Sequence, residues 1–215
     1  MKSDSQLQHD VMEELSFVPT VDHSHIGVSA KDGVVTLTGF VPTYSEKLAA
    51  EHAAHRVAGV KAVAQDLSVR FPSDPKTSDS EIAERVLSIL GWRVNAPANL
   101  EVTVDHGIVV LEGRVDWHYQ RQAVDSLVGG IAGVKSVVNH IQVKPKILSG
   151  DVRGQIMSAF QRSSVIDANA IDVSVEGDTV KLSGTVRGWN ERKMAENAAW
   201  AVPGVTKVVD NIVLG

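Results

Sequence analysis

Two short glycine motifs recur three times along this chain, and their spacing constrains what the chain can fold into. The first motif is Leu-x-Gly, with its glycine at Gly39, Gly113 and Gly184. The second is alanine or proline followed by glycine and valine, with its glycine at Gly59, Gly133 and Gly204. Both glycines advance by 74 residues from the first copy to the second and by 71 from the second to the third. Because two landmarks shift together, one unit is repeated, and its period exceeds the roughly 20–50 residues of solenoid repeats. We therefore predict three small domains, at residues 1–71, 75–147 and 148–215.

Each copy begins with a helical pattern. Apolar residues spaced by four are Leu7, Val11 and Leu15, then Ile82, Val86 and Leu90, then Val152, Ile156 and Phe160. This spacing places them on one face of a helix. Polar residues that favour helix N-caps precede each run, at 4–5, 78–80 and 149–151. We expect an amphipathic helix to open every unit.

A β-hairpin follows the first helix in every copy. Apolar residues alternate from 26, 100 and 171 onward, which indicates strands with one buried face. Two-residue turns containing glycine come next, at 32–33, 106–107 and 177–178, and the return strands are 34–41, 108–115 and 179–186. The Leu-x-Gly glycine lies inside the return strand, where we expect a bulge or a close backbone contact with a helix.

A second helix and a last strand complete the unit. Thr43 and Glu46 have the spacing of a capping box, and alanine-rich or valine-rich stripes follow in all three copies. We expect these helices to stop at Gly59, Gly133 and Gly204, ahead of final strands at 60–71, 134–144 and 205–214. The return strand, helix and last strand form a crossover that makes the last two strands parallel. The predicted fold class is α+β: three tandem α-β-β-α-β two-layer sandwiches, with two helices on a three-stranded mixed sheet.

Proline marks the segments between units, at 72–75 and 144–146. Such linkers are stiff, which favours a defined arrangement of domains.

The order of motifs resembles the BON domain family, named for bacterial osmotically induced and nodulation proteins. The segments VKSVVNHIQV at 134–143 and VTKVVDNIVL at 205–214 are similar to the closing motif of that family. The resemblance covers nearly the whole chain in three copies. It implies a non-enzymatic protein that binds phospholipid or other envelope components, often in a stress response, and members are mostly exported. It also implies a structural role for the six motif glycines.

Charge and composition exclude several classes of protein. The net charge is −5, and each third of the chain carries a small acidic excess, so the basic surface of a nucleic-acid binder is absent from the sequence. The chain has no cysteine, which excludes disulfides and zinc–thiolate sites. The first ten residues have no apolar core of a signal peptide. We expect a cytoplasmic location from this feature, or a periplasmic one if a leader has been removed.

The sequence offers little catalytic chemistry. His23, His25, His52 and His55 all lie in the first copy, and the last two are three residues apart on a helix, where they could share a metal. No carboxylate pattern accompanies them, so we expect exposed histidines, no metal site and no cofactor. Nucleophile-elbow, Walker and dinucleotide-loop motifs are absent. Gly129 and Gly130 fall within a predicted helix, which favours a packing contact over a ligand loop.

Aromatic residues give the remaining candidates. Tyr44, His118 and Trp189 occupy one repeated position just after the return strand, which favours packing at a helix start. Trp92 matches Phe17 at the end of the first helix, where we expect core positions. Three tryptophans are candidates for a contact between domains or subunits, with membrane insertion as the alternative: Trp117, Trp189 and Trp200.

We therefore expect a non-enzymatic binding or scaffolding protein associated with lipid or envelope stress. One alternative is a self-assembling structural protein whose open sheet edges and tryptophans form oligomer interfaces. The other is a small-molecule or metal-binding protein that uses clefts between its domains.

Overall fold

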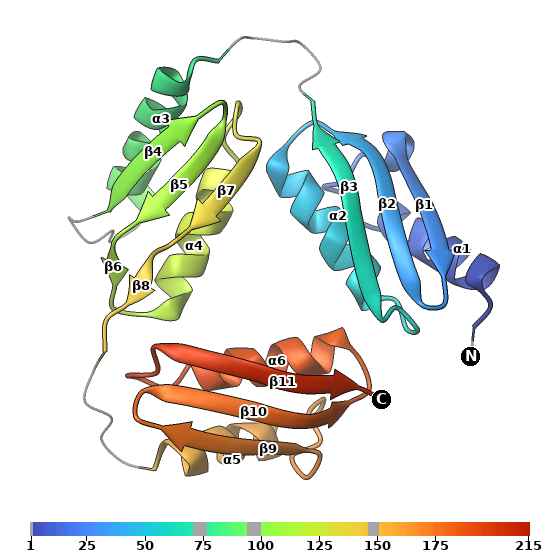
Figure 1. The fold of residues 1–215 in the computed structure, drawn as a ribbon, viewed down its shortest axis with the longest axis vertical. Coiled ribbons are helices and arrows are strands. Elements are labelled where there is room, and N and C mark those ends of the chain that lie inside the picture. Colours follow the sequence, from blue (N-terminus) through green and yellow to red (C-terminus); the bar gives the residue numbers. More distant parts are fainter. Residues whose placement is uncertain (1, 71–76, 94–99, 146–150) are drawn as a thin grey trace. The chain divides into compact units, whose positions relative to one another are not determined.

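The computed structural model describes residues 2–70, 77–93, 100–145 and 151–215, and it builds the same α+β unit three times (Figure 1). We call the units the first, second and third repeat. In each repeat the helices cover one face of a small sheet (Figure 1). The fold class predicted from the sequence is confirmed. The predicted linker at 72–75 and residue 146 lie outside the described residues.

The first repeat shows the complete pattern. Its elements are α1 (Asp4–Ser16), a short 3-10 helix (His23–His25), β1 (Ile26–Lys31), β2 (Val34–Val41), α2 (Tyr44–Arg56) and β3 (Ala62–Val69). The sheet order is β1-β2-β3, in which β1 is antiparallel to β2 and β3 is parallel to β2. The parallel pair is the crossover that the sequence predicts.

The third repeat has the same topology. Its elements are α5 (Val152–Arg162), β9 (Ile171–Glu176), β10 (Thr179–Val186), α6 (Trp189–Trp200) and β11 (Lys207–Leu214). Again the middle strand, β10, is antiparallel to the first and parallel to the last.

In the second repeat, the return strand and the last strand are each broken into two shorter strands. Its elements are α3 (Asp79–Arg93), β4 (Glu101–Asp105), β5 (Ile108–Glu112), β6 (Arg114–Val115), α4 (His118–Gly129), β7 (Ser136–Asn139) and β8 (Gln142–Val143). The return strand is interrupted at Gly113, and the last strand is interrupted at 140–141. As a result β4-β5-β7 form one sheet and β6-β8 form a separate parallel pair.

Local polar contacts start the first helices. In α3 the Ser78 hydroxyl accepts the Glu81 N–H at 3.3 Å, while the Glu81 carboxylate accepts the Ser78 N–H at 2.9 Å, which is a reciprocal capping box. Asp151 caps α5 by accepting the Gly154 N–H at 2.8 Å. In α1 the cap is Ser3, so the prediction of a cap at 4–5 was wrong by one residue: Asp4 instead accepts the Asp32 N–H.

The apolar stripes of the first helices are buried as predicted. Leu7, Val11 and Leu15 join the core of the first repeat, and Val152, Ile156 and Phe160 join the core of the third; the corresponding residues of α3 are equally buried. Phe17 was wrongly predicted to be core and is 82% exposed. The helix phase explains this, because Leu15 points inward and Phe17 follows it by only two residues, at the helix end. The side chain of its counterpart Trp92 lies outside the described residues.

The Leu-x-Gly glycines have backbone angles that other residues rarely adopt. Their φ angles are +115° at Gly39, +138° at Gly113 and +131° at Gly184. A Cβ atom at Gly39 or Gly184 would collide with the backbone carbonyl just before the neighbouring strand, that of His25 or Ala170. The close approach is therefore to the chain that enters the adjacent strand, at the last residue of the short 3-10 helix in the first repeat and at a loop residue in the third. It does not involve the long helices that pack on the sheet. A side chain there requires the backbone to move.

The second motif forms a turn rather than a helix end. The second helices end at Arg56, Gly129 and Trp200, before the glycines that were predicted to stop them. In the first repeat the Val60 N–H donates to the Val57 carbonyl at 3.2 Å and closes a four-residue turn with Gly59 third. Its φ of +101° is the angle that a type II turn requires at this position, and the other two repeats have the same closing bond.

Candidate functional site

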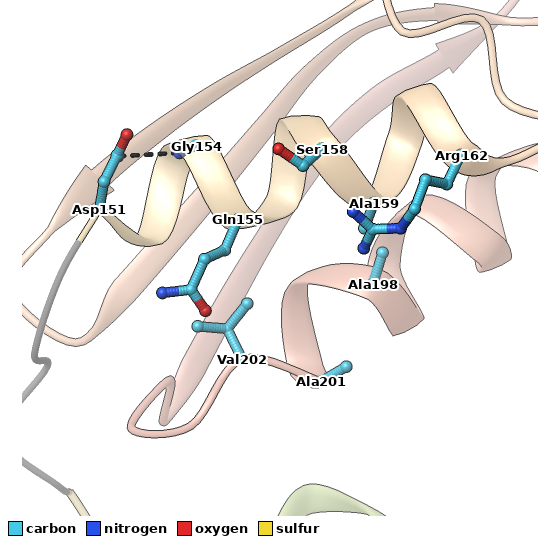
Figure 2. Close-up of a pocket in the computed structure, with 9 residues that line it drawn as sticks. All are labelled: Asp151, Gly154, Gln155, Ser158, Ala159, Arg162, Ala198, Ala201 and Val202. Atoms are coloured by element: carbon cyan, nitrogen blue, oxygen red, sulfur yellow. Dashed lines mark hydrogen bonds between the residues drawn. The ribbon is translucent and has the colours of Figure 1, made fainter.

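A groove lies between the two helices of the third repeat (Figure 2). Its volume is about 590 Å³, and α5 and α6 form its walls. Its small side chains are Ala159, Ala198, Ala201 and Val202, while Gln155, Ser158 and Arg162 lie along α5 and Asp151 lies at the α5 start. The groove thus combines small apolar side chains with polar groups from one helix.

The second repeat has the same groove. Its volume is about 490 Å³, and its lining is Arg85, Ser88, Ile89, Ser126, Leu127, Gly130, Ile131 and Ala132. Equivalent positions differ by 70 between α3 and α5 and by 71 between α4 and α6. Six lining positions of the two grooves coincide on this basis, including the serine pair Ser88 and Ser158. The groove is therefore a property of the repeated unit.

In the first repeat an ion pair crosses the same space. The Glu14 carboxylate of α1 lies 2.7 Å from Arg56 Nη2 and accepts a hydrogen bond of 2.9 Å from Arg56 Nε. These residues occupy the positions of Ala159 and Ala201. Ala53, the equivalent of Ala198, is fully buried, whereas Ala198 is half-buried. The charged pair thus covers the space that is open in the other two repeats.

Exposed apolar side chains mark the outer surface of the first helices. Met12 on α1 is 48% exposed and Leu87 on α3 is 57% exposed, and they occupy one equivalent position. The third repeat has a half-buried methionine, Met157, at that position. Met12 and Leu87 form, with the exposed Phe17, a group that we call the helix-one apolar residues.

The structure places the candidate tryptophans at helix ends and in a loop. Trp189 begins α6, as Tyr44 begins α2 and His118 begins α4, so this repeated position is a helix start. The Arg192 guanidinium lies 5.1 Å from the centre of the Trp189 ring. Trp200 ends α6, donates to Glu196 at 3.2 Å and packs in part against the core of the third repeat. A role of Trp117, Trp189 or Trp200 in assembly stays a prediction.

Comparison with known proteins assigns the repeated unit. The family model described as BON domain matches residues 3–70, 78–145 and 149–215. The chain belongs to the BON domain family. Each repeat is one BON domain, and the recognition made from the sequence motifs is confirmed.

The relatives of these BON domains include a curated bacterial protein. Osmotically-inducible protein Y of Escherichia coli (strain K12) is 31% identical over 138 residues, which covers 58% of this chain and 67% of that protein. Two solved structures of CdsD, a structural protein of the type III secretion system of Chlamydia trachomatis, are each 15% identical. One alignment covers 96% of this chain and 91% of that chain with a TM-score of 0.24; the other, of the C-terminal domain, covers both chains fully with 0.26.

The acceptor at Glu46, for which the sequence predicts a capping box in one copy, recurs in all three BON domains. Glu46, Gln120 and Glu191 share one position in the second helix, and each accepts backbone N–H groups from nearby loops. Glu191 is only 6% exposed and bonds the N–H groups of Asp167 and Arg187, each at 2.9 Å. The spacings of 74 and 71 would have revealed this position, since they connect it across the copies.

The histidines do not converge in the described part of the chain. His52 is exposed, and His55 lies beside Glu51, with 3.9 Å between its Nε2 and the carboxylate. His25 packs against Phe40, with ring centres 4.4 Å apart. Within the described ranges no three histidine, aspartate or glutamate side chains form a group suited to a metal. In the same ranges no helix is long and apolar enough to cross a bilayer.

Proposed function

We propose that this BON protein is a non-enzymatic binding protein of the osmotic stress response that contacts lipid surfaces through its helix-one apolar residues. The name of the E. coli relative supports the link to osmotic stress. Family membership supports a binding role. The observation that carries the lipid contact is the exposure of Met12 and Leu87 at one equivalent position, together with Phe17 at 82% exposure.

The arrangement suits shallow contact with a bilayer. Large apolar side chains that project from a helix surface can enter the boundary between headgroups and acyl chains while the helix lies flat. Scattered exposed apolar residues are ordinary, but here one position is exposed and apolar in two domains, and its third copy is also a methionine. The recurrence of an apolar side chain at this position therefore favours a lipid contact that the domains share.

The charge around these residues argues against attraction to anionic headgroups. Helix α1 carries Asp10, Glu13 and Glu14 close to Met12, and the chain has a net charge of −5. Lipid contact must then come mainly from apolar insertion. Binding should survive raised salt, because screening removes only electrostatic attraction.

Liposome flotation tests this function. We expect the chain to float with phosphatidylcholine vesicles at low and at high salt, and the double variant Met12→Gln/Leu87→Gln to bind at least about tenfold more weakly, given the transfer energy of two such side chains. Val213→Gln is the matched control, because Val213 is 58% exposed and lies on the strand β11 rather than on a first helix. Equal binding by wild type and double variant would refute the contact. Binding that requires anionic lipid and disappears at physiological salt would also refute it.

A further inference from the structure

We propose that the grooves between the helices of the second and third BON domains bind an acidic polypeptide segment. A glutamate or aspartate side chain of that segment takes the place that Glu14 fills in the first domain. The proposal goes beyond lipid contact and does not depend on it, since none of Met12, Phe17 and Leu87 lines either groove.

The first domain shows which chemistry the space accepts. Glu14 and Arg56 make two short contacts of 2.7 and 2.9 Å across the helices, above the fully buried Ala53. Their side chains are 33% and 50% exposed, so the pair sits at the mouth of the space. The space between the two helices of a BON domain can therefore hold a carboxylate that is bound by a guanidinium.

The other two domains keep neither charge of this pair at its position. The positions of Glu14 and Arg56 become Ile89 and Gly130 in the second domain and Ala159 and Ala201 in the third. These four residues carry no charge.

An arginine of the first helix lines each open groove instead. Arg85 lies about one turn before Ile89, and Arg162 lies three residues after Ala159. The Arg162 side chain makes no ion pair or hydrogen bond with any residue that the structure describes, and it reaches toward Ala198 (Figure 2). Arg85 donates a hydrogen bond of 3.4 Å to the Ala132 carbonyl. We infer that the partner of the Arg162 guanidinium is a carboxylate of the bound segment.

The extent of the groove favours a polypeptide over a small acid. Asp151 and Arg162 lie at its two ends, separated by eleven helix positions, which is about 16 Å. An extended segment of about five residues spans that distance. Ser158 and Gln155 offer hydrogen-bonding groups between the ends, and the alanines leave room for a backbone. Because Asp151 would repel an acidic side chain, the carboxylate belongs at the Arg162 end.

Nuclear magnetic resonance titration of the whole chain tests the proposal. The probe is a ten-residue peptide of alternating alanine and glutamate, and the comparison peptides replace glutamate by glutamine or by lysine. We expect saturable amide shifts around Ser158, Ala198 and Ala201 and around the equivalent second-domain positions, with none at Ala53. The glutamine peptide should bind about tenfold more weakly, as expected for loss of a charge-assisted bond. The net charge of −5 opposes general attraction of an acidic peptide, so binding reports the groove.

Three variants separate the groove from general binding. Arg162→Gln should weaken the third-domain site about tenfold and leave the second-domain site as an internal control. Ala159→Glu/Ala201→Arg transfers the ion pair and should abolish the third-domain shifts. Glu14→Ala should open the first-domain groove beside Arg56, so that Ala53 begins to respond to the acidic peptide.

Several results would overturn the proposal. These are absence of saturable shifts, unchanged affinity in Arg162→Gln, equal binding of the glutamine or lysine peptide, or a response at these amides to phosphatidylglycerol vesicles but not to the peptide. The spectrum of each variant shows whether its domain is folded. If Arg162→Gln fails that check, the Ala159→Glu/Ala201→Arg and Glu14→Ala variants decide the outcome.

Discussion

At the scale of single residues, glycines allow the backbone of one strand to approach the chain segment beside it. Gly184 lies where its missing side chain makes room for the Ala170 carbonyl, and its φ is +131°. Gly177 also has a positive φ, +61°, but a Cβ atom there would meet nothing within 4 Å. Gly184 is therefore required by both its backbone angle and the lack of space for a Cβ atom, whereas Gly177 is required only by its backbone angle.

We predict that Gly184→Val destabilises the third domain by roughly 1–3 kcal/mol, the range for overpacking and backbone strain. Gly113→Val should act similarly in the second domain, because Gly113 has a φ of +138°. Gly177→Asn is the control and should cost little, since asparagine tolerates the left-handed region. Urea unfolding followed by amide signals of each domain measures the changes. Equal effects of the Gly184 and Gly177 substitutions would contradict the steric explanation.

Asp79 links acid stability to the hairpin of the second domain. The backbone N–H groups of His106 and Gly107, each donating at 2.9 Å, lower the pKa of this carboxyl below its usual value. A depressed pKa in the folded state contributes stability above the unfolded-state pKa, about 3.9, and that stability is lost as pH falls through the folded-state pKa. The second domain should therefore weaken on acidification below about pH 4.

Asp79→Asn should remove this part of the pH dependence. The urea midpoint of the second domain in the variant should fall less between about pH 5 and pH 3 than that of the wild type, because asparagine does not titrate. Glu101→Gln, at an exposed position of the same domain, is the matched control and should keep the wild-type slope. An identical slope in Asp79→Asn and wild type would show that the carboxylate does not couple folding to pH.

At the scale of elements, the second helices are fixed by an acceptor in their first turn. Glu191 joins α6 to the loop before β9 and to the segment that follows β10, through the N–H groups of Asp167 and Arg187. Gln120 performs a related role with its amide oxygen in the second domain. At one equivalent position the third domain therefore uses a carboxylate acceptor, Glu191, and the second domain uses a neutral amide acceptor, Gln120.

We expect Glu191→Ala to cost the third domain roughly 1–3 kcal/mol, because the N–H groups of Asp167 and Arg187 lose the buried carboxylate that accepts their part-buried hydrogen bonds. Glu191→Gln should retain more than half of that stability, because the amide oxygen can still accept, as in the second domain. Urea unfolding of the third domain measures both variants. A loss in Glu191→Gln as large as in Glu191→Ala would mean that the charge, rather than the acceptor, supports the helix.

At the scale of the whole molecule, each BON domain has its own helices and sheet strands. The first and third domains have separate buried clusters, each with residues of both helices and all three strands. Such units are close to the lower size limit for an independent core. The chain therefore joins three similar units.

We predict that residues 75–147, expressed alone, fold into the second domain. The fragment contains the BON match at 78–145 and every element from α3 to β8. Its amide spectrum should be dispersed and should overlay the second-domain signals of the whole chain. Low stability is compatible with the prediction for a core of this size, whereas an unfolded spectrum would contradict it.

The fold was largely predictable from the sequence, and the candidate sites were not. The stripes at Leu7, Val11 and Leu15 and their counterparts predict the buried faces, because helix and strand periods act locally. Phe17 was misassigned because it is the C-cap directly after α1 and follows the inward-facing Leu15 by two residues, which turns it away from the core. The groove at Ala159 and Ala201 gave no sequence signal, since alanines on helices usually mark packing.

The sequence alone determined the repeat, the α-β-β-α-β order and the family, because these depend on residue spacing along one chain. Only the tertiary structure decided which surfaces are open. Glu14 and Arg56 are 42 residues apart, and their pairing across two helices closes in the first domain a space that Ile89 and Gly130, or Ala159 and Ala201, leave open in the others. Whether such a space is filled depends on side-chain volume and charge from two helices at once, and no single segment contains that information.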